Sequence, residues 1–228
     1  MKTLLSSMLL IWYSGTFGQG LIKPVMTIED ASLKTFLSDL NRAIAEKDKE
    51  FILLHMSSDM VNSFGGDGGI EEFKDYWNFL SDSSEFWDVA EKIISLGGGN
   101  YENGDTYALP YVFSDWPDNG DYDVFECMAI TGEAVNVRNL PSSDANVLGK
   151  LSHDIVKVDW DKSYPPFNAI KIEGLQYVGD KLWYYIESLE GSLKGYVYWD
   201  YIWSPIGYRM GFEKIEGKWA ISYFLSGD

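Results

Sequence analysis

The sequence contains few residues of the types that usually carry catalysis. Its only cysteine is Cys127 and its only histidines are His55 and His153. A cysteine nucleophile needs a neighbouring base and surroundings that lower the pKa of its thiol. Cys127 instead follows Glu126 in the apolar, strand-like run 125–130, which favours a buried and unreactive thiol. We therefore expect a protein that is not an enzyme, with a hydrolase of unrecognised site as the alternative.

The acidic segment 115–126 has the spacing of a calcium loop only in part. It places Asp, Asn, Gly and Glu at positions 1, 5, 6 and 12 of an EF-hand-like loop. Position 3 is Pro117, which has no side-chain oxygen, and the flanks are strand-like where the motif needs helices. A zinc site would need several converging ligands, and the two histidines lie in different parts of the chain. We expect no metal and no cofactor.

A glycine-rich segment, residues 65–69, could hold an anion through its backbone amides if it opens a helix. It lacks the Lys-Ser/Thr pair of a phosphate-binding loop. Asp67 at its centre would repel an anion. We therefore interpret this segment as a structural loop.

Aromatic side chains are concentrated between residues 160 and 203. Because alternate residues of a strand face opposite sides, these rings cannot all belong to a core. Exposed Tyr and Trp rings provide stiff, amphipathic contact area for sugars or peptides. We predict a ligand-binding surface composed of Trp160, Tyr164, Trp183, Tyr185, Tyr198 and Trp199. The alternative is that the long segment 159–181 covers these rings, which would then be ordinary core.

The charge and the N-terminus restrict the partners. The formal net charge of −17 disfavours nucleic acid. Lys2, the apolar run 4–13 and the small residues Thr16 and Gly18 form the pattern of a signal peptide over residues 1–18. No later segment reaches the roughly 20 apolar residues of a membrane-spanning helix. We expect a periplasmic or secreted protein without membrane insertion; a buried N-terminal helix is the alternative.

The elements that must position these residues change in type along the chain. Apolar spacing predicts helices in the first half, with Asp30 or Ser32 as the first cap, while residues 51–54 fit a helix or a strand. Alternation and turn residues predict strands in the second half. The expected helices are 32–45, 70–80 and 83–96, and expected strands include 107–113, 122–130, 208–214 and 218–225. Helices followed by strands indicate an α+β fold.

Residues 134–203 resemble a bacterial SH3-like (SH3b) domain in several segments that occur in the right order. These are Val135-Asn136-Val137-Arg138 before Pro141-Ser142, then 147–151, 155–158, the aromatic pair in Trp183-Tyr184-Tyr185-Ile186, and Gly195-Tyr196-Val197 before Tyr201-Ile202. The sequence departs from the family at Leu140, where Gly is common, and at His153-Asp154, which replaces a turn. The connection 159–181 is longer than usual and could form an extra hairpin around Ile170 and Ile172.

The C-terminal residues 208–228 resemble the terminal hairpin of cystatin-like or NTF2-like α+β domains. The two resemblances together imply an α+β fold of N-terminal helices and an antiparallel sheet, with a small SH3-like β-barrel inserted before the final β-hairpin. The implied domains are 19–126, completed by the hairpin 207–228, and a barrel at 127–206. Alternatively, the hairpin extends the barrel.

The SH3b resemblance implies an exported, non-catalytic binding protein of the bacterial cell envelope. Its partner would be cell-wall peptidoglycan, recognised through peptide or glycan, or an envelope protein. The alternative is a small-molecule pocket in the N-terminal domain, lined by Trp77, Trp87 and Tyr111, with the barrel as a structural brace. Because SH3b domains often accompany cell-wall hydrolases, hydrolysis remains the third possibility.

Overall fold

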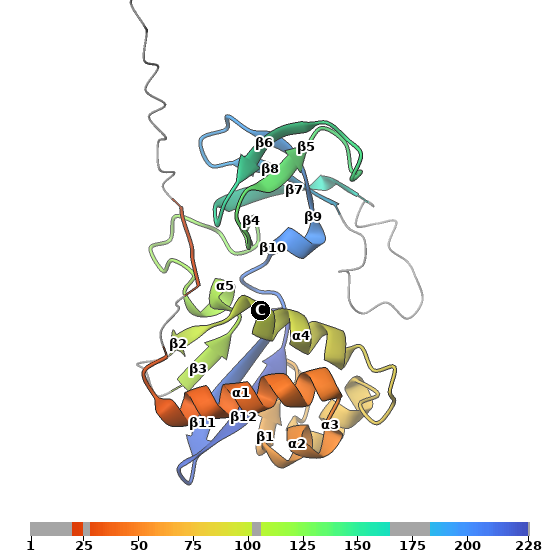
Figure 1. Ribbon diagram of the computed structural model, residues 1–228, viewed down its shortest axis with the longest axis vertical. Coiled ribbons are helices and arrows are strands. Elements are labelled where there is room, and N and C mark those ends of the chain that lie inside the picture. Colours follow the sequence, from red (N-terminus) through yellow and green to blue (C-terminus); the bar gives the residue numbers. More distant parts are fainter. Residues whose placement is uncertain (1–19, 25–27, 102–105, 165–182, 228) are drawn as a thin grey trace, which may run out of the picture.

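The structure is a computed structural model that describes residues 20–24, 28–101, 106–164 and 183–227. It is an α+β protein with two sheets, the first mostly and the second entirely antiparallel, and helices packed on the first sheet (Figure 1). The predicted signal peptide and the proposed hairpin around Ile170 and Ile172 lie outside the described residues. No described helix is both long enough and apolar enough to cross a membrane.

The first sheet combines strands from the two ends of the described chain. Its order is β1-β12-β11-β3-β2, and β1 runs parallel to β12 while the other pairs are antiparallel. The strands are β1 (Met56–Val61), β2 (Gly99–Tyr101), β3 (Thr106–Leu109), β11 (Arg209–Ile215) and β12 (Lys218–Leu225). The C-terminal hairpin β11–β12 therefore belongs to the first sheet, because β11 pairs with β3, and it does not extend the second sheet.

The helices follow the apolar spacing of the sequence. Asp30 caps α1, since its Oδ1 accepts hydrogen bonds from the amides of Ser32 (2.7 Å) and Leu33 (3.1 Å). Helices α1 and α4 lie across the same face of the first sheet (Figure 1), and the ambiguous residues 51–54 are helical. The helices are α1 (Ala31–Glu46), α2 (Lys49–Leu54), α3 (Gly69–Tyr76), α4 (Phe86–Leu96) and the short α5 (Tyr111–Ser114).

The second sheet occupies the chain between β3 and β11. Its order is β10-β4-β7-β8-β9-β5-β6, with antiparallel neighbours throughout. Among the described strands, β10 and β6 at the two ends are not paired with each other, so the sheet is open in its hydrogen bonding and is not the closed barrel that the resemblance implied. The strands are β4 (Cys127–Ile130), β5 (Val135–Arg138), β6 (Val147–Leu151), β7 (Ile155–Tyr164), β8 (Trp183–Ser188), β9 (Lys194–Tyr198) and β10 (Ile202–Trp203).

Two strand predictions were too long. The strand expected at 107–113 ends at Leu109, because Pro110 has no amide hydrogen to continue the ladder, and α5 follows. The strand expected at 122–130 begins only at Cys127. Before it, Asp123 holds a turn in which its Oδ1 accepts a hydrogen bond from the Phe125 amide at 2.8 Å.

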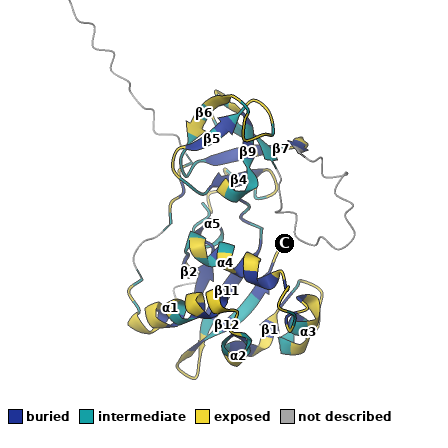
Figure 2. Ribbon diagram, turned by 45° about the vertical axis from the view of Figure 1, so that its right-hand side comes forward, coloured by how far each residue is buried: buried dark blue, intermediate teal, exposed yellow. Residues whose placement is uncertain are grey.

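Strand β4 contributes to two hydrophobic cores at once. Cys127 and Ala129 belong to the core of the first sheet and its helices, whereas Met128 and Ile130 belong to a second core inside the second sheet. All four side chains are buried. Figure 2 shows the buried residues of both sheets in dark blue. The shared strand therefore joins the two sheets through packed apolar side chains.

Candidate ligand-binding face

Strands β8 and β9 present four aromatic side chains on the outer face of the second sheet. Their register places Trp183 opposite Tyr198 and Tyr185 opposite Tyr196. The ring centroids of each pair are 5.1 Å apart. All four side chains are only partly buried, while Ile186 and Val197, which alternate with them on the two strands, are fully buried in the second core. We call these four residues the aromatic ladder.

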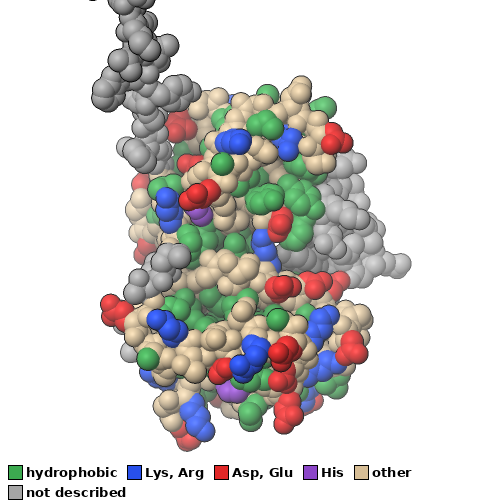
Figure 3. Space-filling model, in the orientation of Figure 1, with side chains coloured by type: hydrophobic (Ala, Val, Ile, Leu, Met, Phe, Trp, Pro, Cys, Tyr) green, Lys and Arg blue, Asp and Glu red, His purple; other side chains and the backbone are tan. Residues whose placement is uncertain are grey.

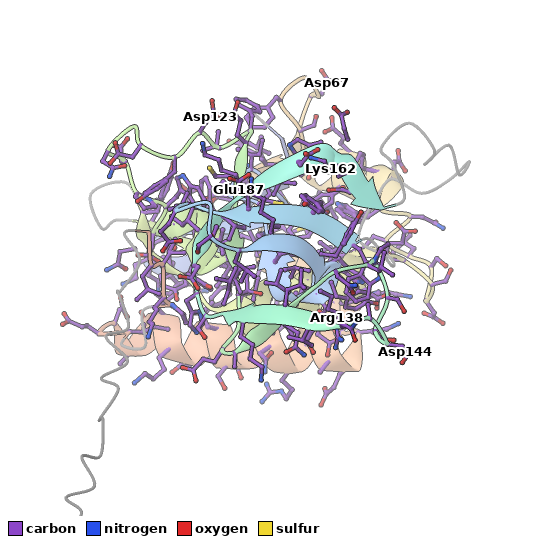
Figure 4. The ribbon with its side chains drawn as sticks, turned by 90° about the horizontal axis from the view of Figure 1, so that it is seen from above. Asp67, Asp123, Arg138, Asp144, Lys162 and Glu187 are labelled. Atoms are coloured by element: carbon purple, nitrogen blue, oxygen red, sulfur yellow. The ribbon has the colours of Figure 1, made fainter. Side chains whose placement is uncertain are left out.

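Cationic side chains lie on both sides of the aromatic ladder. Lys162 of β7 has its Nζ 5.0 Å from the centroid of the Tyr185 ring and is paired with Asp159. Arg138 of β5 stands opposite Tyr196. Figure 4 labels Arg138 and Lys162 on opposite sides of the strands between them. The ladder is thus an aromatic surface with a cationic side chain at each margin, and of these two Lys162 is neutralised by its pair with Asp159.

A pocket of about 730 Å³ opens beside one end of the ladder. Its aromatic wall contains Trp183, Tyr198 and Tyr201, and its polar wall contains residues of β5 and of its flanking turns. Two of these polar residues, Arg138 and Glu133, carry opposite charges. Figure 3 shows hydrophobic side chains gathered on the front of the upper, second sheet. The pocket has the size of a small-ligand site and a mixed apolar and polar lining.

Three of the six predicted site residues lie together, and Trp160 lies elsewhere on the same sheet. Trp183, Tyr185 and Tyr198 are members of the aromatic ladder. Trp160 packs edge-on against Tyr184, at 5.9 Å between ring centroids, and its Nε1 donates to the Phe125 carbonyl at 3.1 Å. Because Tyr184 alternates with the ladder residues of β8, Trp160 lies on the other face of the sheet.

The remaining two predicted residues lie at the ends of strands. Trp199 follows β9 in a short 3₁₀ turn, where its ring centroid is 6.0 Å from Nζ of Lys92 on α4. It therefore stands at the junction with the first sheet. Tyr164 pairs with Trp183 in the backbone register of β7 and β8, and its side chain is outside the described part of the structure.

Sequence reasoning missed the polar wall of the pocket and one ring of the ladder. Tyr196 is two residues before Tyr198, so the alternation of a strand could have placed both on one face. Arg138 alternates with the buried Val135 and Val137, which also indicates an outward side chain. The pairing of β5 with β9 could not be predicted from local spacing, because it joins residues that are far apart in the sequence.

The residues considered for catalysis do not form a site in the described part of the chain. Cys127 is buried, and this burial raises the pKa of its thiol. Nδ1 of His55 is 2.8 Å from the Phe51 carbonyl oxygen, whereas Nδ1 of His153 is 3.5 Å from the Tyr111 hydroxyl. The two histidines thus have separate surroundings. Among the described residues, no group of three His, Cys, Asp or Glu side chains is placed to hold a metal ion.

The glycine-rich segment is occupied by a side chain of the protein itself. The amide of Gly68 donates to Oε2 of Glu72 at 3.0 Å. A carboxylate of α3 thus occupies one of the amides that an anion would need. This supports the interpretation of residues 65–69 as a structural loop.

The aromatic residues expected to line a pocket in the N-terminal domain are core residues. Trp77, Trp87 and Tyr111 are each at least 94% buried, because their exposed fractions are 6%, 1% and 1%. The Trp77 ring packs against Phe224 at 5.1 Å. All three rings belong to the hydrophobic core of the first sheet and its helices.

The chain was compared with protein-family models, with curated proteins and with solved structures, and none of the three comparisons found a match.

Proposed function

We propose that the protein is an exported, non-catalytic binding protein of the bacterial cell envelope. Residues 127–206 form an SH3b-like module that recognises cell-wall peptide or glycan, or an envelope protein. Residues 19–126 and 207–228 form the α+β domain that carries this module. The observation that carries the proposal is the aromatic ladder with its adjoining pocket on the outer face of the second sheet.

The physical properties of this face suit a polymer with both apolar and polar groups. Sugar rings and peptide side chains can lie flat on Trp and Tyr rings and gain contact area with little loss of conformational freedom. Because Trp183, Tyr185, Tyr196 and Tyr198 sit on paired strands, their positions are fixed before binding. The charged and polar groups of the pocket can then select among ligands of similar shape.

The SH3b-like assignment is supported by the order of the strands. Strands β5, β6, β7, β8 and β9 coincide with the segments that resemble the family. Strand β10 begins at Ile202, the last residue of the resembling segments, and the additional strand β4 pairs with it; together they extend the sheet towards the first core. We attribute to them the attachment of the module to the α+β domain.

The experiment that tests the proposal is co-sedimentation of the protein with purified peptidoglycan over a range of salt concentrations. We expect saturable binding that persists at high salt, because stacking on aromatic rings is not screened by ions. Trp183→Ala should abolish binding. Trp160→Ala is the matched control, since this Trp is on the same sheet and 42% exposed but lies on the other face.

Equal loss of binding in the two variants would contradict the proposed face. Absence of binding by the unaltered protein would exclude peptidoglycan and leave an envelope protein as the partner. The alternative function, a small-molecule pocket lined by Trp77, Trp87 and Tyr111, has less support because these rings pack in the core.

A further inference from the structure

The charged side chains that line the pocket restrict which ligands can bind there, in addition to the requirement that the ligand stacks on aromatic rings. The side chains of Asp and Glu outnumber those of Lys and Arg by 35 to 18 in this protein. Six lysines and Arg42 form ion pairs with carboxylates in the described part of the chain. Arg138 forms none there, although acidic residues are abundant.

Arg138 is held in place by the protein while most of its donors stay available. Its Nη1 donates to the Ala145 carbonyl at 2.7 Å, within the connection from β5 to β6. A guanidinium has five N–H donors in a rigid fork that matches the two oxygens of a carboxylate. The side chain is half-buried and lines the pocket beside Ser142 and Ser143. It is therefore a pre-positioned donor group facing ligand space.

Glu133 adds a negative charge to the lining of the same pocket. It is exposed, lines the pocket together with Tyr201, and forms no ion pair among the described residues. A polyanion, such as a phosphate-rich polymer, would be repelled by this carboxylate and by the net charge of −17. A ligand that carries one carboxylate and one ammonium group would match both charged residues of the pocket lining, Arg138 and Glu133.

We infer that the pocket binds a zwitterionic peptide segment, with its carboxylate on Arg138, its ammonium group towards Glu133, and its aliphatic part against Trp183 and Tyr198. This inference rests on the proposed function and specifies its ligand as cell-wall peptide in preference to glycan. Arg138 and Glu133 are then the residues that determine specificity, and the aromatic pair supplies contact area. Loss of one charge-assisted pair should weaken binding by about tenfold or more.

The test is isothermal titration of the whole protein with four probes. The first is the soluble peptide fraction released from sacculi by an amidase, with free carboxylates and amines. The second and third are the same peptides after amidation of the carboxylates or acetylation of the amines. The fourth is the peptide-free glycan. We expect the unmodified peptides to bind most tightly, and each modification to weaken binding about tenfold.

Two variants link these effects to the residues. Arg138→Gln should weaken binding of the unmodified peptides about tenfold and leave binding of the amidated peptides unchanged, because the partner group is then already absent. Glu133→Gln should likewise weaken binding of the unmodified peptides about tenfold and leave binding of the acetylated peptides unchanged. Arg138→Gln also changes the hydrogen bond to the Ala145 carbonyl, so thermal unfolding of this variant checks that it still folds. Glu133→Gln at an exposed position and the two chemical modifications of the peptides leave that hydrogen bond intact and test the inference independently.

The outcomes separate this inference from the proposed function. If Trp183→Ala abolishes binding to sacculi but neither amidation nor Arg138→Gln changes affinity, the binding function stands and the zwitterionic ligand is wrong. Glycan that binds as tightly as the peptides also overturns it. If the unaltered protein binds neither sacculi nor any of the four probes, the cell-wall function fails and the inference fails with it.

Discussion

Trp183 and Tyr198 face each other across neighbouring strands, with ring centroids 5.1 Å apart and an angle of 54° between the ring planes. Both rings lie on the outer face of the second sheet, whereas Ile186 of the same strand β8 is fully buried on the inner face. The two faces of β8 should therefore differ in what they contribute. The outer rings serve contact with a ligand, and the inner side chains hold the sheet together.

Trp183→Ala should leave the fold largely intact. Loss of an outward cross-strand pair lowers the free energy of unfolding by up to about 1 kcal/mol. Ile186→Ala creates a cavity in the core and should lower it by about 2–5 kcal/mol. Urea unfolding of both variants measures this difference. A loss in Trp183→Ala as large as that in Ile186→Ala would identify Trp183 as a core residue.

The sequence predicted those parts of the fold that depend on local spacing. The apolar residues of α1 were identified, and Asp30, one of the two caps considered with Ser32, is the cap observed. Alternation located β8, whereas β9 was expected only from the SH3b resemblance. The strand expected through Pro110 was wrong because that residue removes a donor from the ladder.

The candidate site was only half predictable, for a physical reason. The face of Trp160 cannot be deduced from spacing, since the register of β7 against β8 shifts between Asp159 and Tyr164. Trp199 lies in a turn, where alternation no longer applies. Arg138 meets the ladder only because β5 pairs with β9, and that pairing joins distant parts of the chain. The alternation within β5 or within β9 does not show which strand each of them pairs with.

Gly195→Ala tests the close approach of β5 and β9 that positions Arg138. An added Cβ at Gly195 would lie well inside contact distance of the Arg138 carbonyl oxygen and 3.0 Å from Cγ1 of Val137. Because the nearest atom belongs to the backbone, it cannot turn away, and the strands must separate. We expect a loss of about 1–3 kcal/mol in the free energy of unfolding and weaker binding to peptidoglycan.

Gly65→Ala is the control for this variant, since no heavy atom lies within 4 Å of the added Cβ. Its stability should change by less than about 0.5 kcal/mol. Chemical unfolding and co-sedimentation of the two variants make the comparison. Unchanged stability in Gly195→Ala would show that β5 and β9 do not approach each other this closely at Gly195.

Lys92→Met tests the polar contact between the two sheets. Nζ of Lys92, on α4, donates to both the carbonyl oxygen and Oδ1 of Asp200 at 2.6 Å. The Lys92 side chain is mostly buried, so this pair is less screened than a surface pair. We expect the free energy of unfolding to fall by about 1–2 kcal/mol.

The matched control is Lys74→Met, which removes a pair with Glu71 within the single helix α3. Such a pair stabilises by about 0.5 kcal/mol or less. Both variants should unfold in one transition, because the apolar contacts of β4 with both cores remain. An equal fall in the free energy of unfolding of the two variants would mean that the contact of Lys92 with Asp200 stabilises the protein no more than a pair within one helix.

Asp30→Asn separates two roles of one carboxylate. Oδ1 of Asp30 caps α1, and Oδ2 accepts a hydrogen bond from Nζ of Lys214 on β11 at 2.5 Å. The hydrogen bond from Lys214, followed by those from Ser32 and Leu33, holds the pKa of Asp30 well below its ordinary value of 3.8. An asparagine keeps an oxygen for the cap but cannot form the ion pair.

The pH dependence follows from the direction of this shift. Since the pKa is lower in the folded state, the ionised carboxylate stabilises the fold at pH values above about 3.8, and this contribution is lost as the pH falls through the folded-state pKa. Asp30→Asn should therefore be less stable than the unaltered protein at pH 5–7 and approach it in stability below about pH 3. Thermal unfolding midpoints from pH 2 to 7 measure the difference. A difference that stays constant over this range would show that Asp30 acts only through the helix cap and not through Lys214.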